Sequence, residues 1–148
     1  MKTIILFIVV LIFLGACSSL LRREREVPLE GRDYQFSIHE DFVAKKFILK
    51  LKSFSDQELC VSVDAWPNSL GQLSFADDYV YILVGDEKYP YLKARNFGYC
   101  VGSCEVRIAP RKTIKGFVSF PEFEDKAFIE VNSMRSLVYS VQPYFCEN

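Results

Sequence analysis

Short runs in which apolar and polar residues alternate are the feature that most restricts how this chain can fold. In one run, Phe47, Leu49 and Leu51 alternate with Lys50 and Lys52. Successive side chains of a strand point to opposite faces of its sheet, so this run predicts a strand with one buried face. No window carries a convincing helical stripe. Further strands are predicted at residues 34–38, 59–63, 73–75, 79–84, 88–92, 106–108, 114–120, 128–131 and 137–141.

The polar residues 55–58 lie between the runs 47–52 and 59–64, and this arrangement predicts a β-hairpin. Gly85 and Asp86 predict the turn of a second hairpin. Pro90 has no backbone N–H to donate, so its strand is expected at the edge of a sheet. Many short strands separated by turns are typical of a sandwich or a barrel, and the chain is therefore predicted to be all-β.

Residues 108–120 resemble a recurring segment of immunoglobulin-like accessory domains. In those domains a turn containing Pro precedes a Thr and then a strand with alternating Gly and aromatic residues. Pro110, Thr113 and Gly116 match this pattern, and Arg111 replaces the usual Gly. The resemblance implies an immunoglobulin-like antiparallel β-sandwich of about 7–9 strands.

Residues 4–14 are apolar and uncharged. This stretch is shorter than the roughly 20 residues of a membrane-spanning helix and is typical of a signal peptide. The sequence Leu14-Gly15-Ala16-Cys17 that follows resembles the lipobox of bacterial lipoproteins at every position. The resemblance implies cleavage before Cys17, acylation of Cys17 and attachment of the protein to a membrane through the lipid.

The chain is accordingly divided into a signal peptide (1–16), an acylated cysteine with its tether (17–30) and a β-sandwich domain (31–148). The tether carries charges of both signs, so we expect it to be solvated. In Gram-negative lipoproteins an Asp after the cysteine favours retention in the inner membrane. Ser18 at this position implies the outer membrane, with the domain facing the periplasm.

Four cysteines remain besides Cys17, and an even number in an exported chain is typical of two disulfides. Four cysteines allow three pairings, and the sequence alone does not choose among them. We favour Cys100 with Cys104, because the short segment between them can form a tight turn. Cys60 would then pair with Cys146 and close a long loop. A zinc site is disfavoured, because Cys60 and Cys146 do not belong to paired Cys-x2-Cys knuckles.

The sequence offers little chemistry. The formal net charge of −1 shows no basic excess that would attract nucleic acid. His39 is the only histidine, and no nucleophile signature accompanies it, so no catalytic residue is assigned and the protein is not expected to be an enzyme. Asp77-Asp78 and Asp86-Glu87 lack the spacing of a calcium loop, and we expect no metal and no cofactor.

Two loops are candidates for binding a protein partner. Trp66, the only tryptophan, and Asn68 lie in the first loop. Residues 96–104 form a second, glycine-rich loop that contains Phe97 and Tyr99. Aromatic residues on rigid loops are common binding anchors. The alternatives are that Trp66 closes one end of the sandwich and that residues 96–104 are a stapled crossover between the sheets.

The lipobox, Cys60, the segments 66–72 and 96–100, Cys104 and the strand from Ile114 together resemble a set of small bacterial lipoproteins. More loosely, such lipoproteins are similar to immunity proteins that protect bacteria from antagonistic effectors in the periplasm, and to periplasmic inhibitors of lysozyme. The resemblance implies a lipoprotein that blocks a toxin or an envelope enzyme through its loops. The rival interpretation is a structural accessory or assembly lipoprotein of an envelope complex.

Overall fold

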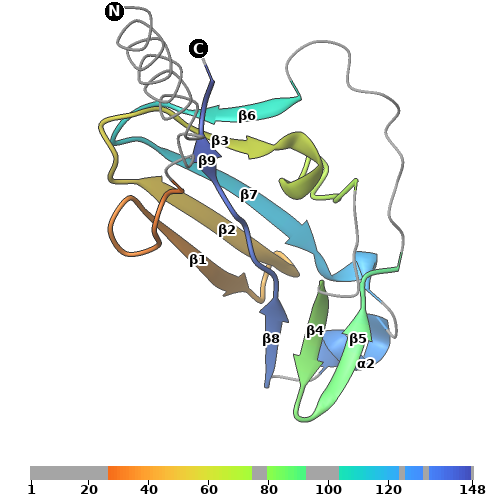
Figure 1. Cartoon of the computed structure of the whole chain (residues 1–148). Helices are drawn as coiled ribbons and strands as arrows, with labels where there is room; N and C mark the ends of the chain where they lie inside the picture. Colours follow the sequence, from red (N-terminus) through yellow and green to blue (C-terminus); the bar gives the residue numbers. More distant parts are fainter. Residues whose placement is uncertain (1–26, 75–79, 93–103, 124–125, 132–133, 148) are drawn as a thin grey trace, which may run out of the picture.

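The structure is a computed structural model that describes residues 27–74, 80–92, 104–123, 126–131 and 134–147. These residues form nine strands in three antiparallel sheets of three strands each, with little helix (Figure 1). The prediction of an all-β, sandwich-like fold is confirmed. The strands are distributed over three hydrogen-bonded sheets, rather than the two of an immunoglobulin-like sandwich.

Each sheet has one central strand with a partner on both sides. Sheet A has the order β1 (Tyr34–Asp41), β2 (Lys46–Ser53), β7 (Thr113–Ser119). Sheet B has the order β6 (Glu105–Ile108), β3 (Leu59–Ser62), β9 (Tyr144–Phe145). Sheet C has the order β5 (Glu87–Pro90), β4 (Tyr81–Val84), β8 (Arg135–Val138). The short helices are η1 (Val63–Ala65), η2 (Phe120–Glu122) and α2 (Lys126–Val131).

The core is built on strand β2. Phe47, Leu49 and Leu51 are buried, and they belong to the same hydrophobic core as Leu59 and Val61 of sheet B. The lysines that alternate with them point to the opposite face of sheet A. Full burial of each of these apolar side chains stabilises the folded state by roughly 1.5–3 kcal/mol.

The predicted hairpin between residues 47–52 and 59–64 is wrong. Strand β2 pairs with β1 and β7, and β3 pairs with β6 and β9, so the two runs lie in different sheets. Both runs have an apolar face that must be removed from water. When the two strands lie in opposite sheets, each covers the apolar face of the other. In a hairpin the two apolar faces would lie side by side in one sheet, and neither would cover the other.

Two further strand predictions are wrong. Residues 128–131 belong to helix α2, and Leu73 and Ser74 lie outside the strands. Short apolar runs do not distinguish a buried strand from one turn of helix, which explains the first error. Strand β9 has only two residues and carries no periodic signal, so it was not predicted.

The predicted hairpin turn at Gly85 and the edge position of Pro90 are confirmed. Strands β4 and β5 form a hairpin, and Gly85 in its turn has a φ of 60°. Pro90 lies in β5, an edge strand of sheet C. Arg111 between β6 and β7 has a φ of 61°, the left-handed conformation that Gly adopts more easily. Arg111 therefore takes a backbone conformation that costs Gly less than it costs Arg.

A disulfide joins Cys60 of β3 to Cys146, 86 residues further along the chain. Strand β9 pairs with β3 beside this bond, so the C-terminal segment is fixed to the central strand of sheet B. In the chain-entropy model a loop of this length corresponds to roughly 4–5 kcal/mol of stabilisation. Cys104 is also disulfide-bonded, and its predicted partner Cys100 lies outside the described residues.

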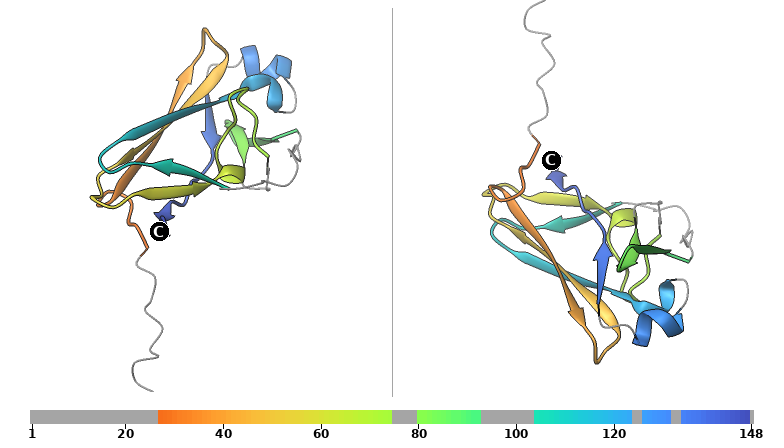
Figure 2. Two further views of the ribbon diagram at one scale, coloured as in Figure 1. Left: turned by 90° about the horizontal axis from the view of Figure 1, so that it is seen from above. Right: turned by 90° about the horizontal axis from the view of Figure 1, so that it is seen from below.

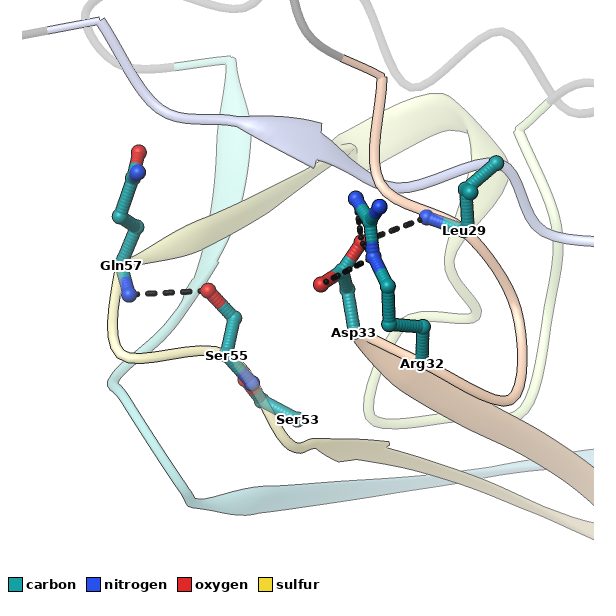
Figure 3. A network of polar contacts seen from close by, with 6 residues as sticks. All are labelled: Leu29, Arg32, Asp33, Ser53, Ser55 and Gln57. Atoms are coloured by element: carbon teal, nitrogen blue, oxygen red, sulfur yellow. Dashed lines mark hydrogen bonds and ion pairs between the residues drawn. The ribbon is translucent and has the colours of Figure 1, made fainter.

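The chain enters the domain through a hydrogen-bonded turn centred on Asp33 (Figure 3). The Asp33 carboxylate accepts hydrogen bonds from the Arg32 guanidinium and from the backbone N–H of Leu29, both at 2.8 Å. These two contacts, Arg32 first, lower the pKa of Asp33. The Asp33 carbonyl accepts from the N–H groups of Phe54 and Ser55, which joins the turn to the β2–β3 connection. This entry turn and β9 lie at one end of the molecule (Figure 2).

A buried cation joins sheet C to sheet A at the other end. The side chain of Arg135 in β8 is 0% exposed, and its Nη2 lies 2.5 Å from Oε1 of Glu40 in β1. Its Nη1 donates to the carbonyl of Ile129 in α2. The guanidinium also lies over the rings of Phe120 and Phe42, 4.5 and 5.1 Å from their centroids. One side chain therefore contacts β1, the β1–β2 turn, η2 and α2.

Arg135→Met should lower the free energy of unfolding by about 2–4 kcal/mol, because it leaves the partly buried Glu40 carboxylate without its cation. Urea denaturation followed by circular dichroism measures the change. Lys45→Gln is the matched control, since it breaks the exposed Lys45–Glu130 ion pair in the same region. That pair should contribute less than about 1 kcal/mol. Equal losses in the two variants would contradict the special role of Arg135.

Candidate binding surfaces

Trp66 is not a surface anchor. It is only 7% exposed and belongs to the hydrophobic core. A Cβ on Gly116 of β7 would lie 3.2 Å from the indole and 2.7 Å from the Pro67 ring. The missing side chain at Gly116 leaves space on the inner face of β7, and Trp66 and Pro67 fill it. The burial of Trp66 agrees with the alternative that it closes one end of the sandwich, and it leaves little of the indole available to a partner.

Asn68 holds the loop after Trp66 in shape. Its Oδ1 accepts hydrogen bonds from the backbone N–H groups of Leu70 and Gln72, at 2.9 and 3.0 Å. Gly71 has a φ of 74°, and a Cβ there would come within 2.3 Å of the Phe117 ring. The Asn68 side chain is thus engaged within its own loop, and Leu70 is the exposed apolar residue at the tip.

Several residues singled out in the sequence lie outside the described residues, and the predictions made for them stay predictions. They are Cys17, Asp77, Asp78, Phe97, Tyr99 and Cys100.

His39 is exposed on β1, opposite Ile48 of β2. Among the residues that the structure describes, no three His, Cys, Asp or Glu side chains are grouped so that they could hold a metal ion. Asp86 and Glu87 lie in and beside the exposed β4–β5 turn, where Glu87 accepts a hydrogen bond from the hydroxyl of Tyr89 at 2.6 Å. The described helices are all too short or too polar to cross a membrane.

Four large apolar side chains are exposed at the end of the molecule that holds Arg135. Phe42 and Val43 in the β1–β2 turn are 58% and 92% exposed. Val131 at the end of α2 and Met134 before β8 are 80% and 78% exposed. We call these four residues the distal apolar patch. Contiguous exposed apolar side chains are typical of protein–protein interaction sites.

The three segments of the distal apolar patch are held together by the contacts around them. Lys45 of the β1–β2 turn forms an ion pair with Glu130 of α2 at 2.9 Å. Arg135, next to Met134, packs against the Phe42 ring and donates to Ile129 of α2. These contacts fix the patch on a scaffold before any partner binds, which reduces the entropy lost on binding.

The patch lies at the opposite end of the β1–β2 hairpin from the entry turn. Tyr34 pairs with Ser53 at the entry end, and Asp41 pairs with Lys46 next to the patch. A strand of this length separates the two ends by roughly 24 Å. The sequence carries a signal for this patch, because Phe42, Val43 and Ala44 are three consecutive apolar residues in a turn, where polar residues are usual.

Comparisons with known proteins give no relative for this chain: no family model matches it, and no curated protein or solved structure is significantly similar to it.

Trp66→Ala should lower the free energy of unfolding by about 3–5 kcal/mol, because it removes a core side chain and leaves a cavity against Gly116. Leu70→Ala, in the same loop but exposed, should change it by less than about 0.5 kcal/mol. Urea denaturation followed by circular dichroism makes the comparison, since the variant lacks the tryptophan needed for fluorescence. If Trp66→Ala were as stable as Leu70→Ala, the buried position of Trp66 would be incorrect.

Proposed function

We propose that this protein is a lipid-anchored lipoprotein of the bacterial cell envelope that binds another protein through loops and thereby blocks a toxin or an envelope enzyme. The distal apolar patch is the observation that carries the proposal. Four large apolar side chains, from the β1–β2 turn, the end of α2 and the residue before β8, are exposed to water at one end of the domain, and exposed apolar patches are typical of protein–protein interaction sites.

The binding segments in this proposal differ from the loop around Trp66 that the sequence offered. Trp66 is part of the core, so the contact is assigned to the β1–β2 turn, the end of α2 and the residue before β8. Phe97 and Tyr99 remain candidates for a second contact. The blocking role is supported by the resemblance to periplasmic immunity and inhibitor lipoproteins.

The anchor in this proposal is the acylated Cys17 in the outer membrane, with the domain facing the periplasm. Residues 18–28 provide eleven residues between the lipid and the entry turn, enough to reach at most about 40 Å. Tethering confines the protein to the membrane surface, where its concentration near an envelope partner is raised without any additional contact.

The anchor predicts a defined mature N-terminus. Mass spectrometry of the protein extracted from membranes should give a chain that begins at Cys17 and carries fatty acyl groups. Cys17→Ala should leave the full-length, unacylated chain, because the modified sulfur is absent. A wild-type chain that retains residues 1–16 without acylation would contradict the anchor.

The patch predicts a site for the partner. The double variant Val43→Asp, Val131→Asp should weaken partner binding more than tenfold, because it places two carboxylates in an apolar contact. The readout is the amount of the toxin or envelope hydrolase that co-purifies with the tagged protein, and the inhibition of that partner's activity. Circular dichroism verifies that the variant is folded.

Leu70→Asp is the matched control for this experiment, because Leu70 is an exposed apolar residue on a different loop. It should bind the partner like the wild type. Equal binding by both variants would exclude the patch as the site. Co-purification of an envelope assembly complex, with no inhibited toxin or hydrolase, would favour the assembly role instead.

A further inference from the structure

The outer face of sheet A is basic. Lys46, Lys50 and Lys52 of β2 and Lys115 of β7 all lie on this face, opposite the buried Phe47, Leu49 and Leu51. Lys50, Lys52 and Lys115 are exposed and Lys46 is half-buried. We call these four lysines the basic face. Gln35, Ser37, His39 and Asp41 of β1 lie on the same side of sheet A, and Ile48 of β2 and Phe117 of β7 lie between the lysines.

Lys46 and Lys52 lie over the rings of Phe117 and Phe54, 5.0 and 4.9 Å from their centroids, whereas the centre of the basic face is unfavourable for the isolated domain. Lys50 and Lys115 are direct cross-strand partners, and like charges in that position repel. Within the described chain, none of the four lysines forms an ion pair with a carboxylate. Asp41, in register with Lys46, uses its carboxylate to accept a hydrogen bond from the N–H of Ala44.

The other described basic groups of the domain contrast with this face. Most of them have a carboxylate partner, in the pairs Arg32–Asp33, Lys45–Glu130, Arg107–Glu58, Arg111–Asp56 and Arg135–Glu40. The chain as a whole is slightly acidic, with a formal net charge of −1. The positive charge of the basic face is therefore local, and it is complementary to an anionic surface outside the protein.

We propose that the basic face docks on the anionic phospholipid headgroups of the membrane that carries the lipid anchor. This inference rests on the proposed acylation of Cys17. Lys52 pairs with Gln35, one position from the Tyr34–Ser53 pair at the entry turn. The basic face therefore begins where the tether joins the domain and extends along β2 for roughly 20 Å. The domain lies with sheet A against the bilayer.

The chemistry of the face fits a bilayer better than a single folded partner. All four charges are lysines, which are flexible point charges without the fixed fork of arginine. Such groups match a plane of mobile phosphates that offers no fixed geometry. The described arginines, by contrast, are used in pairs with defined carboxylates inside the domain.

The expected strength follows from the contribution of a single lysine near an anionic membrane surface, which corresponds to about fivefold in binding. Removing two lysines should therefore weaken the docking by about 25-fold. High salt should weaken it as well, because the contacts are electrostatic and lie at the protein surface.

The test is lysine footprinting on the acylated, full mature protein in vesicles. The protein is reconstituted in phosphatidylcholine vesicles with or without phosphatidylglycerol and treated with a lysine-acylating reagent. Mass spectrometry then measures the rate at which each lysine is modified. Lys50, Lys52 and Lys115 should react at least fivefold more slowly on the anionic vesicles, and high salt should restore their reactivity. Lys88 of β5 serves as the internal reference and should react equally on both.

A pair of variants gives the control for charge. Lys50→Gln, Lys115→Gln should remove the protection of Lys52 without loss of stability, because it also relieves the cross-strand repulsion. Arg107→Gln, Arg111→Gln removes the same charge from β6 and the β6–β7 turn, keeps the reference Lys88, and should leave the protection intact. The fold of both is checked by thermal denaturation.

The outcomes separate this inference from the proposed anchor. The N-terminal peptide in the same digest shows whether Cys17 is acylated, so failure of the anchor is seen independently. An acylated protein whose basic face reacts equally on both kinds of vesicle would overturn the docking. Protection of these lysines by an acidic envelope protein, with none from the anionic vesicles, would also overturn it and assign the face to that protein.

Discussion

The alternation of residues along β2 is the constraint on which the rest of the molecule depends. Its odd-numbered positions, Phe47, Leu49 and Leu51, place one face of sheet A in the core. The same period of two places Lys50 and Lys52 together on the other face. A shift of one residue in register would bury lysines and expose the core residues, so folding and the basic face are specified by the same pattern.

Much of the fold could be predicted from the sequence because it depends on local periodicity. The all-β class, the β4–β5 hairpin and the edge position of Pro90 follow from residues close together in the chain. The partners of β2 and β3 could not be predicted in this way. Pairing is decided by which apolar faces cover each other across the core, and two runs joined by a short polar segment fit a hairpin and a crossover equally well.

The candidate sites, too, depend on contacts between residues far apart in the chain, which local sequence patterns do not predict. The sequence placed Trp66 in a loop, but its burial depends on the absence of a side chain at Gly116, fifty residues away. The patch around Val43 depends on Arg135, whose partners come from β1, α2 and η2. Neither contact has a local signature. The sequence around Trp66 would look the same if the loop were exposed. Likewise, a charged strand residue such as Arg135 carries no local sign that it is buried among several elements.

The two proposed surfaces lie in different parts of the domain, and this separation limits how they can work together. The basic face covers the outside of sheet A and begins at the entry turn, whereas the patch lies beyond the opposite end of the β1–β2 hairpin. If sheet A rests on the bilayer, the patch is held at the side of the domain, a hairpin length away from the tether. A partner bound there would be positioned close to the membrane surface. Docking through the lysines would then restrict the orientations of the patch. A docked domain would therefore lose less rotational entropy on binding an envelope partner than a domain held by its tether alone.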